Sequence, residues 1–178
     1  MAAGSTTYTF EVTLSDLTRD VYKTLTVRIA RHSSEVSEST ICKLLAYCLE
    51  YDDALELSKG LDDPEMPALW ARDLTGALTT WIEVGSPSAE KLHKASKKVT
   101  CVKIYTYKNP ETVLQLLSKE KIHRSELINL FSFAHGFLTE LASTLEKRNR
   151  WSITISDDSL YIEIAAKSFA SEVVQHSL

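Results

Sequence analysis

Two stretches near the amino terminus alternate between apolar and polar residues, and this alternation limits the possible folds more than any other feature of the chain. The apolar positions are Tyr8, Phe10, Val12 and Leu14 in the first stretch, and Leu25, Val27 and Ile29 in the second. A period of two places every second side chain on the same face of a strand. We therefore predict a half-buried antiparallel hairpin over about 7–14 and 22–31, with a turn between its strands.

The same pattern returns near the carboxyl terminus. Trp151, Ile153 and Ile155 alternate before Asp157-Asp158, and Leu160, Ile162 and Ile164 alternate after it. Two alternating runs around a short polar pair are typical of a hairpin. The residues from about 166 onward have no comparable pattern, and we expect them to form a loose tail.

The middle of the chain mixes helical and strand patterns. Ile41, Leu44, Leu45 and Cys48 have the spacing of an amphipathic helix, which predicts a helix over about 35–50. Ser86 and Pro87 indicate the cap and first residue of a lysine-rich helix over 87–98. We further expect a loop over 60–67 and helices at 110–119 and 134–147. Strands are expected at 54–58, 69–73, 77–84, 99–107 and 126–132. The pattern of 126–132 would also suit a helix.

Composition indicates one globular domain over residues 1–178. The chain is 44% hydrophobic and 25% charged, which suits a soluble protein with an apolar core. No run approaches the roughly 20 apolar residues of a membrane span, and the first residues lack the pattern of a secretory signal. We therefore expect a cytoplasmic protein without membrane contact. The three cysteines form no C-x-x-C pair, and Cys42 and Cys48 are expected to be small buried hydrophobes.

The net charge of −4 gives the protein no general attraction to nucleic acid. A local basic element is nevertheless present, because Lys91, Lys94 and Lys98 share one face of the predicted helix. The Lys91–Lys98 helix is therefore the candidate contact for DNA or RNA, although such a face is more often only solvated.

Four strings, in order and spacing, resemble the YaeQ family: Arg31-His32-Ser33-Ser34-Glu35, Ile41-Cys42-Lys43-Leu44-Leu45-Ala46, Gly60-Leu61, and Trp81-Ile82-Glu83-Val84-Gly85. The resemblance also includes Pro87 with the basic helix, and Thr106-Tyr107, and it extends from Tyr8 to about Ile164. It implies an α+β, restriction-endonuclease-like fold of the PD-(D/E)XK superfamily. The predicted α-β-β-β-α-β order of the middle elements agrees with this core, which would form a mixed sheet with the two hairpins added.

The resemblance also implies a metal site for Mg²⁺ or Mn²⁺, in which carboxylates hold the ion and the ion stabilises charge on a phosphate. Glu83 matches the second acid of the motif, and the Val84 carbonyl is a further candidate ligand. Ala68 occupies the position of the first acid, and Gly85 that of the lysine. Additional candidates are Glu35 and Glu38 as ligands, Lys91 and Lys94 as replacements for the lysine, and Glu65 or Asp73 as substitutes for the lost acid.

These residues also have simpler explanations: Glu83 as a partner for a helix lysine, and Glu35 as an acid in the first turn of a helix. If a site exists, Glu83, Ala68 and Glu35 or Glu38 should meet in one concavity, with Lys91 or Lys94 at its rim. Because an acid and the lysine are missing, we expect a nuclease-like protein with weak or no activity. The alternatives are an active metal-dependent phosphodiesterase and a non-catalytic module that binds nucleic acid or protein.

Overall fold

A computed structural model describes residues 4–60 and 63–178. Residues 1–3, 61 and 62 lie outside these ranges. Residues 61 and 62 belong to the predicted loop, and Leu61 is also part of the Gly60-Leu61 string. The elements are β1 (Ser5–Asp16), β2 (Val21–His32), α1 (Ser37–Leu49), β3 (Leu55–Leu57), β4 (Leu69–Arg72), β5 (Leu78–Val84), α2 (Ala89–Lys98), β6 (Cys101–Tyr105), α3 (Pro110–Leu117), a 3-10 turn (Ser125–Leu127), β7 (Ile128–Phe133), α4 (Phe137–Ala142), β8 (Arg148–Ser156), β9 (Ser159–Ile164) and β10 (Lys167–Ser177).

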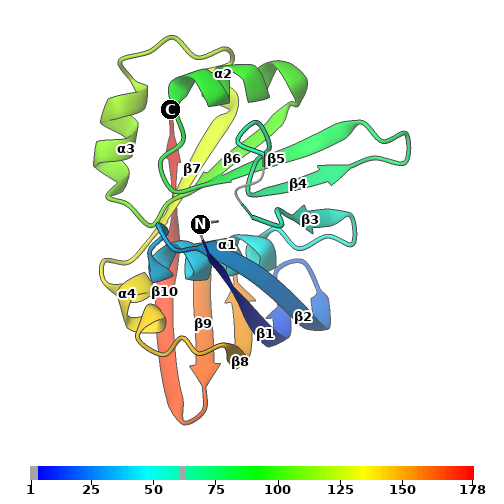
Figure 1. Ribbon diagram of the computed structural model, residues 1–178, viewed down its shortest axis with the longest axis vertical. Coiled ribbons are helices and arrows are strands. Elements are labelled where there is room, and N and C mark those ends of the chain that lie inside the picture. Colours follow the sequence, from blue (N-terminus) through cyan, green and yellow to red (C-terminus); the bar gives the residue numbers. More distant parts are fainter. Residues whose placement is uncertain (1–3, 61–62) are drawn as a thin grey trace.

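The described strands form one ten-stranded mixed sheet in the order β2-β1-β8-β9-β10-β7-β6-β5-β4-β3. Strands β5, β6 and β7 are mutually parallel, and β1 is parallel to β8. The remaining neighbours pair antiparallel. The sheet curls around α1, which lies on its concave side (Figure 1). Both predicted hairpins therefore extend the sheet that also contains the middle strands.

Helix α1 is buried around most of its circumference. Its apolar residues Ile41, Leu44 and Leu45 pack with β1 and β8 in the larger core, which we call the inner core. A ring contact between Phe10 and Trp151, with centroids 5.4 Å apart, lies in the same core. The cysteines of α1 are buried as expected, and burial raises the pKa of the Cys48 thiol to about 12.

A second core lies on the opposite face of β5, β6 and β7, beneath α2 and α3. Trp81, Val102, Ile104 and Leu130 pack there with Leu92 and Val113. Strand β5 contributes to both cores, since Ile82 belongs to the inner core and Trp81 to this outer core. Alternation along β5 thus places Glu83 on the same face as Trp81, toward α2.

The structure confirms most of the predicted elements. Strand β5 lies between β4 and β6, and α1, β3, β4, β5, α2 and β6 follow one another in the expected order. Residues 128–133 form a strand, which decides between the two patterns considered for 126–132. Helix α2, however, begins at Ala89, because the Ser88 side chain, not that of Ser86, accepts a hydrogen bond from the Lys91 N–H.

The prediction of a loose tail from about 166 was wrong. Residues 167–177 form β10, which pairs with β9 along its first half and with β7 along its second. The strand begins after a turn in which Ala165 adopts a left-handed conformation with φ of 53°. Strand β10 joins β9, the strand just before it, to the distant strand β7, so its order depends on pairing with both neighbours more than on a pattern of its own.

The predicted helix over 134–147 was also largely wrong, because only α4, Phe137–Ala142, is helical there. The chain then turns into β8, which starts at Arg148, three residues earlier than expected. Asn149 stabilises this turn: its side chain accepts from the Glu146 N–H at 2.9 Å and donates to the Glu146 carbonyl at 2.7 Å. These local bonds compete with continuation of the helix.

We predict that a chain ending at Ala166 loses cooperative folding. Removing β10 leaves the facing edges of β7 and β9 without hydrogen-bond partners and splits the sheet. Size-exclusion chromatography and thermal unfolding followed by circular dichroism should show aggregation or a broad transition. A chain that lacks only Ser177 and Leu178 keeps most of the β10 pairing and is the control. A sharp, wild-type-like transition in the longer deletion would contradict the prediction.

Candidate functional site

Glu83, the central predicted site residue, is a buried and fully engaged carboxylate. It is 5% exposed, and its Oε1 accepts a hydrogen bond from Trp81 Nε1 at 2.8 Å. Lys91 Nζ, from the first turns of α2, lies 3.0 Å from Oε1 and 3.2 Å from Oε2. The same ammonium donates to the Met66 carbonyl at 3.0 Å. Both carboxylate oxygens of Glu83 therefore have donors from the protein. This agrees with the simpler explanation of Glu83 as the partner of a helix lysine.

Ala68 and Gly85 occupy the positions where the family resemblance places the first acid and the lysine. Ala68 directly precedes β4, and its side chain packs against the inner core, whereas Glu83 faces α2 and the outer core. Ala68 offers only a methyl group and therefore no oxygen ligand. Gly85 has φ of 98°, and a Cβ added there would lie 3.1 Å from Cε1 of Tyr107. A lysine at position 85 would thus be strained and crowded.

Glu35 and Glu38 lie on the other side of the sheet, around the start of α1. Glu35 accepts from Lys43 Nζ at 2.6 Å, from the His32 N–H at 2.8 Å and from the Ser39 hydroxyl at 3.3 Å. Burial by itself would raise the pKa of Glu35, but these hydrogen bonds and the Lys43 charge hold the pKa below its ordinary value. Glu83 faces α2, so the structure does not bring Glu83 together with Glu35 or Glu38.

The other candidates are engaged elsewhere. Lys94 pairs with Glu90 at 3.0 Å and lies 3.9 Å from Glu65. Asp73 accepts from the Thr75 and Ala77 backbone in the turn between β4 and β5. Val84, which was a candidate through its backbone carbonyl, lies in β5 in register with Tyr105 of β6, and its side chain packs against the inner core, on the face opposite Glu83.

Mg²⁺ and Mn²⁺ require several oxygen ligands in a near-octahedral arrangement. In residues 4–60 and 63–178, no three side chains of His, Cys, Asp or Glu converge as a set that could hold a metal ion. Glu83 has one carboxylate, which Lys91 and Trp81 already occupy, and Ala68 adds no oxygen. The residues around Glu83 therefore do not fit a divalent ion.

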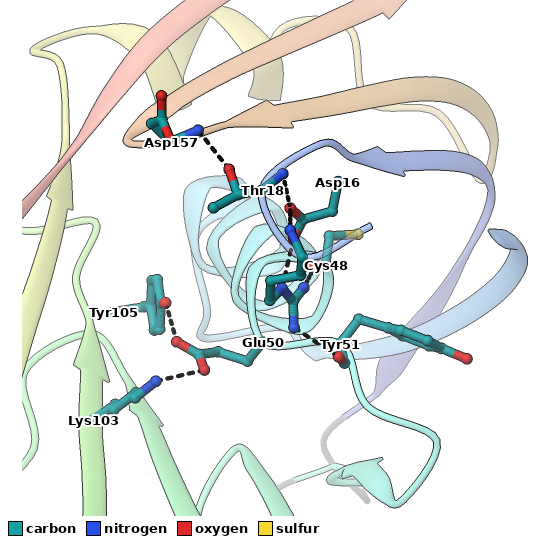
Figure 2. Close-up of polar contacts among 9 residues, drawn as sticks. Asp16, Thr18, Cys48, Glu50, Tyr51, Lys103, Tyr105 and Asp157 are labelled. Atoms are coloured by element: carbon teal, nitrogen blue, oxygen red, sulfur yellow. Dashed lines mark hydrogen bonds and ion pairs between the residues drawn. The ribbon is translucent and has the colours of Figure 1, made fainter. Parts of the chain in front are cut away.

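Sequence reasoning missed a polar network at the carboxyl end of α1, shown in Figure 2. Glu50 accepts from Lys103 Nζ at 2.6 Å and also from the Tyr105 hydroxyl. Burial, followed by the nearby Glu50 charge, raises the pKa of Tyr105 well above its ordinary value. The signal was present in β6, where Lys103 and Tyr105 alternate with the apolar Val102 and Ile104.

Arg19 continues this network on the β1–β2 side. It pairs with the buried Asp16 at 2.6 Å and donates to the carbonyls of Cys48 and Tyr51, at 3.3 and 2.8 Å. The network borders a cavity of about 190 Å³, which Asp16, Arg19 and Tyr105 help to line. Since its charged groups satisfy one another, we assign the network to holding α1 in place.

An open groove of about 700 Å³ lies at the carboxyl ends of β6 and β7. Such ends of parallel strands are frequent ligand-binding places in α/β proteins. The lining mixes acidic, basic, aromatic and small polar side chains, among them Glu38, Tyr107, Lys108, Ser132, His135 and Glu140. Glu38 thus lines a groove, but one to which Glu83 does not contribute.

We predict that replacing Lys91 with Met destabilises the protein more than replacing Glu83 with Gln. The first change leaves a buried carboxylate without its cation, which costs about 3 kcal/mol. The second leaves a neutral amide that can still accept from Trp81, and Lys91 keeps the Met66 carbonyl, so about 1–2 kcal/mol is expected. Urea unfolding measures both values. Equal stability of Lys91→Met and wild type would contradict the buried pair.

We predict that Glu35 stabilises the fold only above acidic pH. Because its folded pKa is depressed below the ordinary 4.5, its contribution is present above that value and is lost as the pH falls through the folded pKa. The melting temperature of wild type should therefore exceed that of Glu35→Gln near neutral pH, and the difference should shrink as the pH falls below the ordinary pKa of 4.5 and through the lower folded pKa. Glu163→Gln, on the exposed face of β9, is the control. A difference that stays constant over this range would contradict the sign of the shift.

Comparison with known proteins supports a family assignment. The chain is similar to the "Uncharacterized protein YaeQ" of Escherichia coli K12, with 28% identity over 176 residues, 92% of this chain and 95% of that protein. It is also similar to the protein of that name from Salmonella typhi, with 25% identity over 166 residues, covering 93% of this chain and 92% of that one. The helices of the described residues are all too short or too polar to span a bilayer.

Solved structures agree with this assignment. The crystal structure of the YaeQ protein from Pseudomonas syringae matches with a TM-score of 0.87 and 28% identity, covering 98% of this chain and 97% of that one. The YaeQ protein from Xanthomonas axonopodis pv. citri shares the fold, with a TM-score of 0.88, 24% identity, and coverage of 98% and 99% of the two chains. The model of the family described as YaeQ protein matches residues 1–173. This chain belongs to the YaeQ family.

Proposed function

We propose that this YaeQ-family protein has a nuclease-like fold of the PD-(D/E)XK kind, does not hydrolyse phosphodiesters, and acts by binding a partner. The observation that carries the proposal is the state of Glu83. Its carboxylate is buried, ion-paired with Lys91 and hydrogen-bonded to Trp81. A group that stabilises the core in this way contributes no free oxygen to a metal ion.

Two further features support the absence of hydrolysis. Ala68, at the position of the lost acid, packs against the inner core and offers no carboxylate, and the space beside Gly85, at the position of the lost lysine, is filled by Tyr107. The carboxylate that could compensate, Glu35, lies on the other face of the sheet and is bound to Lys43. The motif has therefore become a set of structural interactions, while the fold around it is kept.

The alternative is a Mg²⁺- or Mn²⁺-dependent phosphodiesterase in which Glu83 is a ligand and Lys91 or Lys94 assists. In that reaction Glu83 would have to release Lys91 before it could hold the ion. The ammonium has only one other acceptor within hydrogen-bond distance, the Met66 carbonyl, among the described residues. Breaking the pair to bind metal would thus cost a substantial part of the fold's stability.

The test is hydrolysis of plasmid DNA and of a labelled single-stranded RNA by wild type and Glu83→Gln, with Mg²⁺ or Mn²⁺. We expect no metal-dependent cleavage by either protein. Glu163→Gln makes the same change at an exposed site and is the control. Equal cleavage by wild type, Glu83→Gln and Glu163→Gln would indicate a contaminating nuclease. Cleavage by wild type and Glu163→Gln that is lost in Glu83→Gln would establish the alternative and overturn the proposal.

A further inference from the structure

Positive charge is concentrated in two segments of this acidic protein. Residues 90–98 and 119–126 contain seven of the 20 lysines and arginines, but only three of the 24 aspartates and glutamates. The two segments together carry a net charge of +4, whereas the whole chain carries −4, so the remainder carries −8. Residues 90–98 contribute +3 of this charge and residues 119–126 contribute +1.

Tertiary contacts bring the two segments together. The His123 N–H donates to His93 Nδ1 at 3.1 Å, and Ser96 Oγ lies 3.4 Å from His123 Nδ1. Arg124 and Ser96 line the same small depression next to the end of α2. In Figure 1 the connection from α3 to β7 passes beside α2 at the end of the molecule away from the amino-terminal hairpin.

The cations of this region fall into two groups. Lys91 and Lys94 are held by carboxylates, as described above. The others are exposed and, within the part of the chain that the structure describes, form no ion pair. We call this second group the basic surface: Lys97, Lys98, Lys119, Lys121 and Arg124.

Interactions within the fold account for only part of the basic surface: Lys98 Nζ lies 5.7 Å from the centroid of the Trp81 ring. Lys97 and Lys98 lie in the last turn of α2, where they also favour the helix dipole, but this explanation does not extend to the α3–β7 connection. The exposed hydroxyl of Ser118 and the partly exposed hydroxyl of Ser125 flank that connection. Lysine, arginine and serine are the side chains that most often contact nucleic-acid phosphates. Local cations with free donors attract a polyanion even when the whole protein is acidic.

We propose that the basic surface binds the phosphate backbone of nucleic acid without reading its sequence. This inference rests on the proposed binding role and names its partner. Because phosphate contacts release counterions, affinity should fall steeply with salt, with a slope of about −0.9 for each contact on duplex DNA. The Lys91–Lys98 helix predicted from sequence supplies only part of the surface, through Lys97 and Lys98.

The experiment measures binding of a fluorescein-labelled duplex DNA of mixed sequence by anisotropy, in EDTA, over a range of KCl concentrations. For wild type we expect a Kd on the order of 10⁻⁵ M at moderate salt. In the variant Lys119→Glu, Lys121→Glu, Arg124→Glu we expect affinity to fall by about tenfold or more, and the salt slope to decrease by about 2 to 3.

A matched control reverses three cations far from this surface: Arg28→Glu, Arg148→Glu, Lys167→Glu. These residues lie on β2, β8 and β10, are exposed, and change the net charge by the same amount. The control should bind within about threefold of wild type, because exposed charges beyond a Debye length are screened. Equal weakening of both triple variants would mean that only net charge matters, and would overturn the proposal.

Two further outcomes would overturn the basic surface: no binding of DNA by wild type, or sedimentation of wild type with phosphatidylserine vesicles without any binding of DNA. The second outcome would identify an anionic membrane as the partner. A failure of the proposed non-hydrolytic function would give a different result. If wild type both binds and, with Mn²⁺, cleaves the duplex in a Glu83-dependent way, the non-hydrolytic function is wrong while the basic surface stands.

Discussion

The enclosure of α1 by the curled sheet is the constraint on which the rest of the structure depends. A helix buried on most of its surface must be held at its ends by polar groups, because its last carbonyls have no partners within the helix. Arg19 supplies donors to two of the nearby carbonyls, and Glu50 binds Lys103 and Tyr105 of β6. The helix thereby joins the amino-terminal hairpin to the parallel strands, and both cores form around that arrangement.

This arrangement separates Glu83 from Glu35. Strand β5 has a core on each face, so the residues that alternate along it go to different environments. Glu83 enters the outer core with Trp81, and a carboxylate buried there requires a cation. Lys91 of α2 supplies it. Glu35 lies just before α1 on the other face, where it pairs with Lys43 of that helix. Each acid that could have held a metal ion therefore stabilises a different part of the fold.

The same packing gathers charge of the opposite sign. Helix α2 packs on β6 and α3 on β7, and the connection after α3 passes the end of α2, where His93 and His123 hold it. Basic residues from two separate segments then share one surface. Metal chemistry and phosphate contact are independent properties of such a fold, since one needs converging carboxylates and the other needs only exposed cations.

Local pattern by itself determined the two hairpins and α1, because alternation and helical spacing report directly on which side chains are buried, while the family resemblance rested on short strings in a particular order. Only the tertiary structure decided the order of β10, which has little pattern of its own but pairs with β7 and β9. It likewise decided that the predicted helix over 134–147 gives way to β8 from Arg148, which pairs with β1. The tertiary structure also decided the role of Glu83. Sequence places this acid on a strand, but its role depends on which face it occupies and which cation lies opposite, and both are set by the way α2 packs over the sheet.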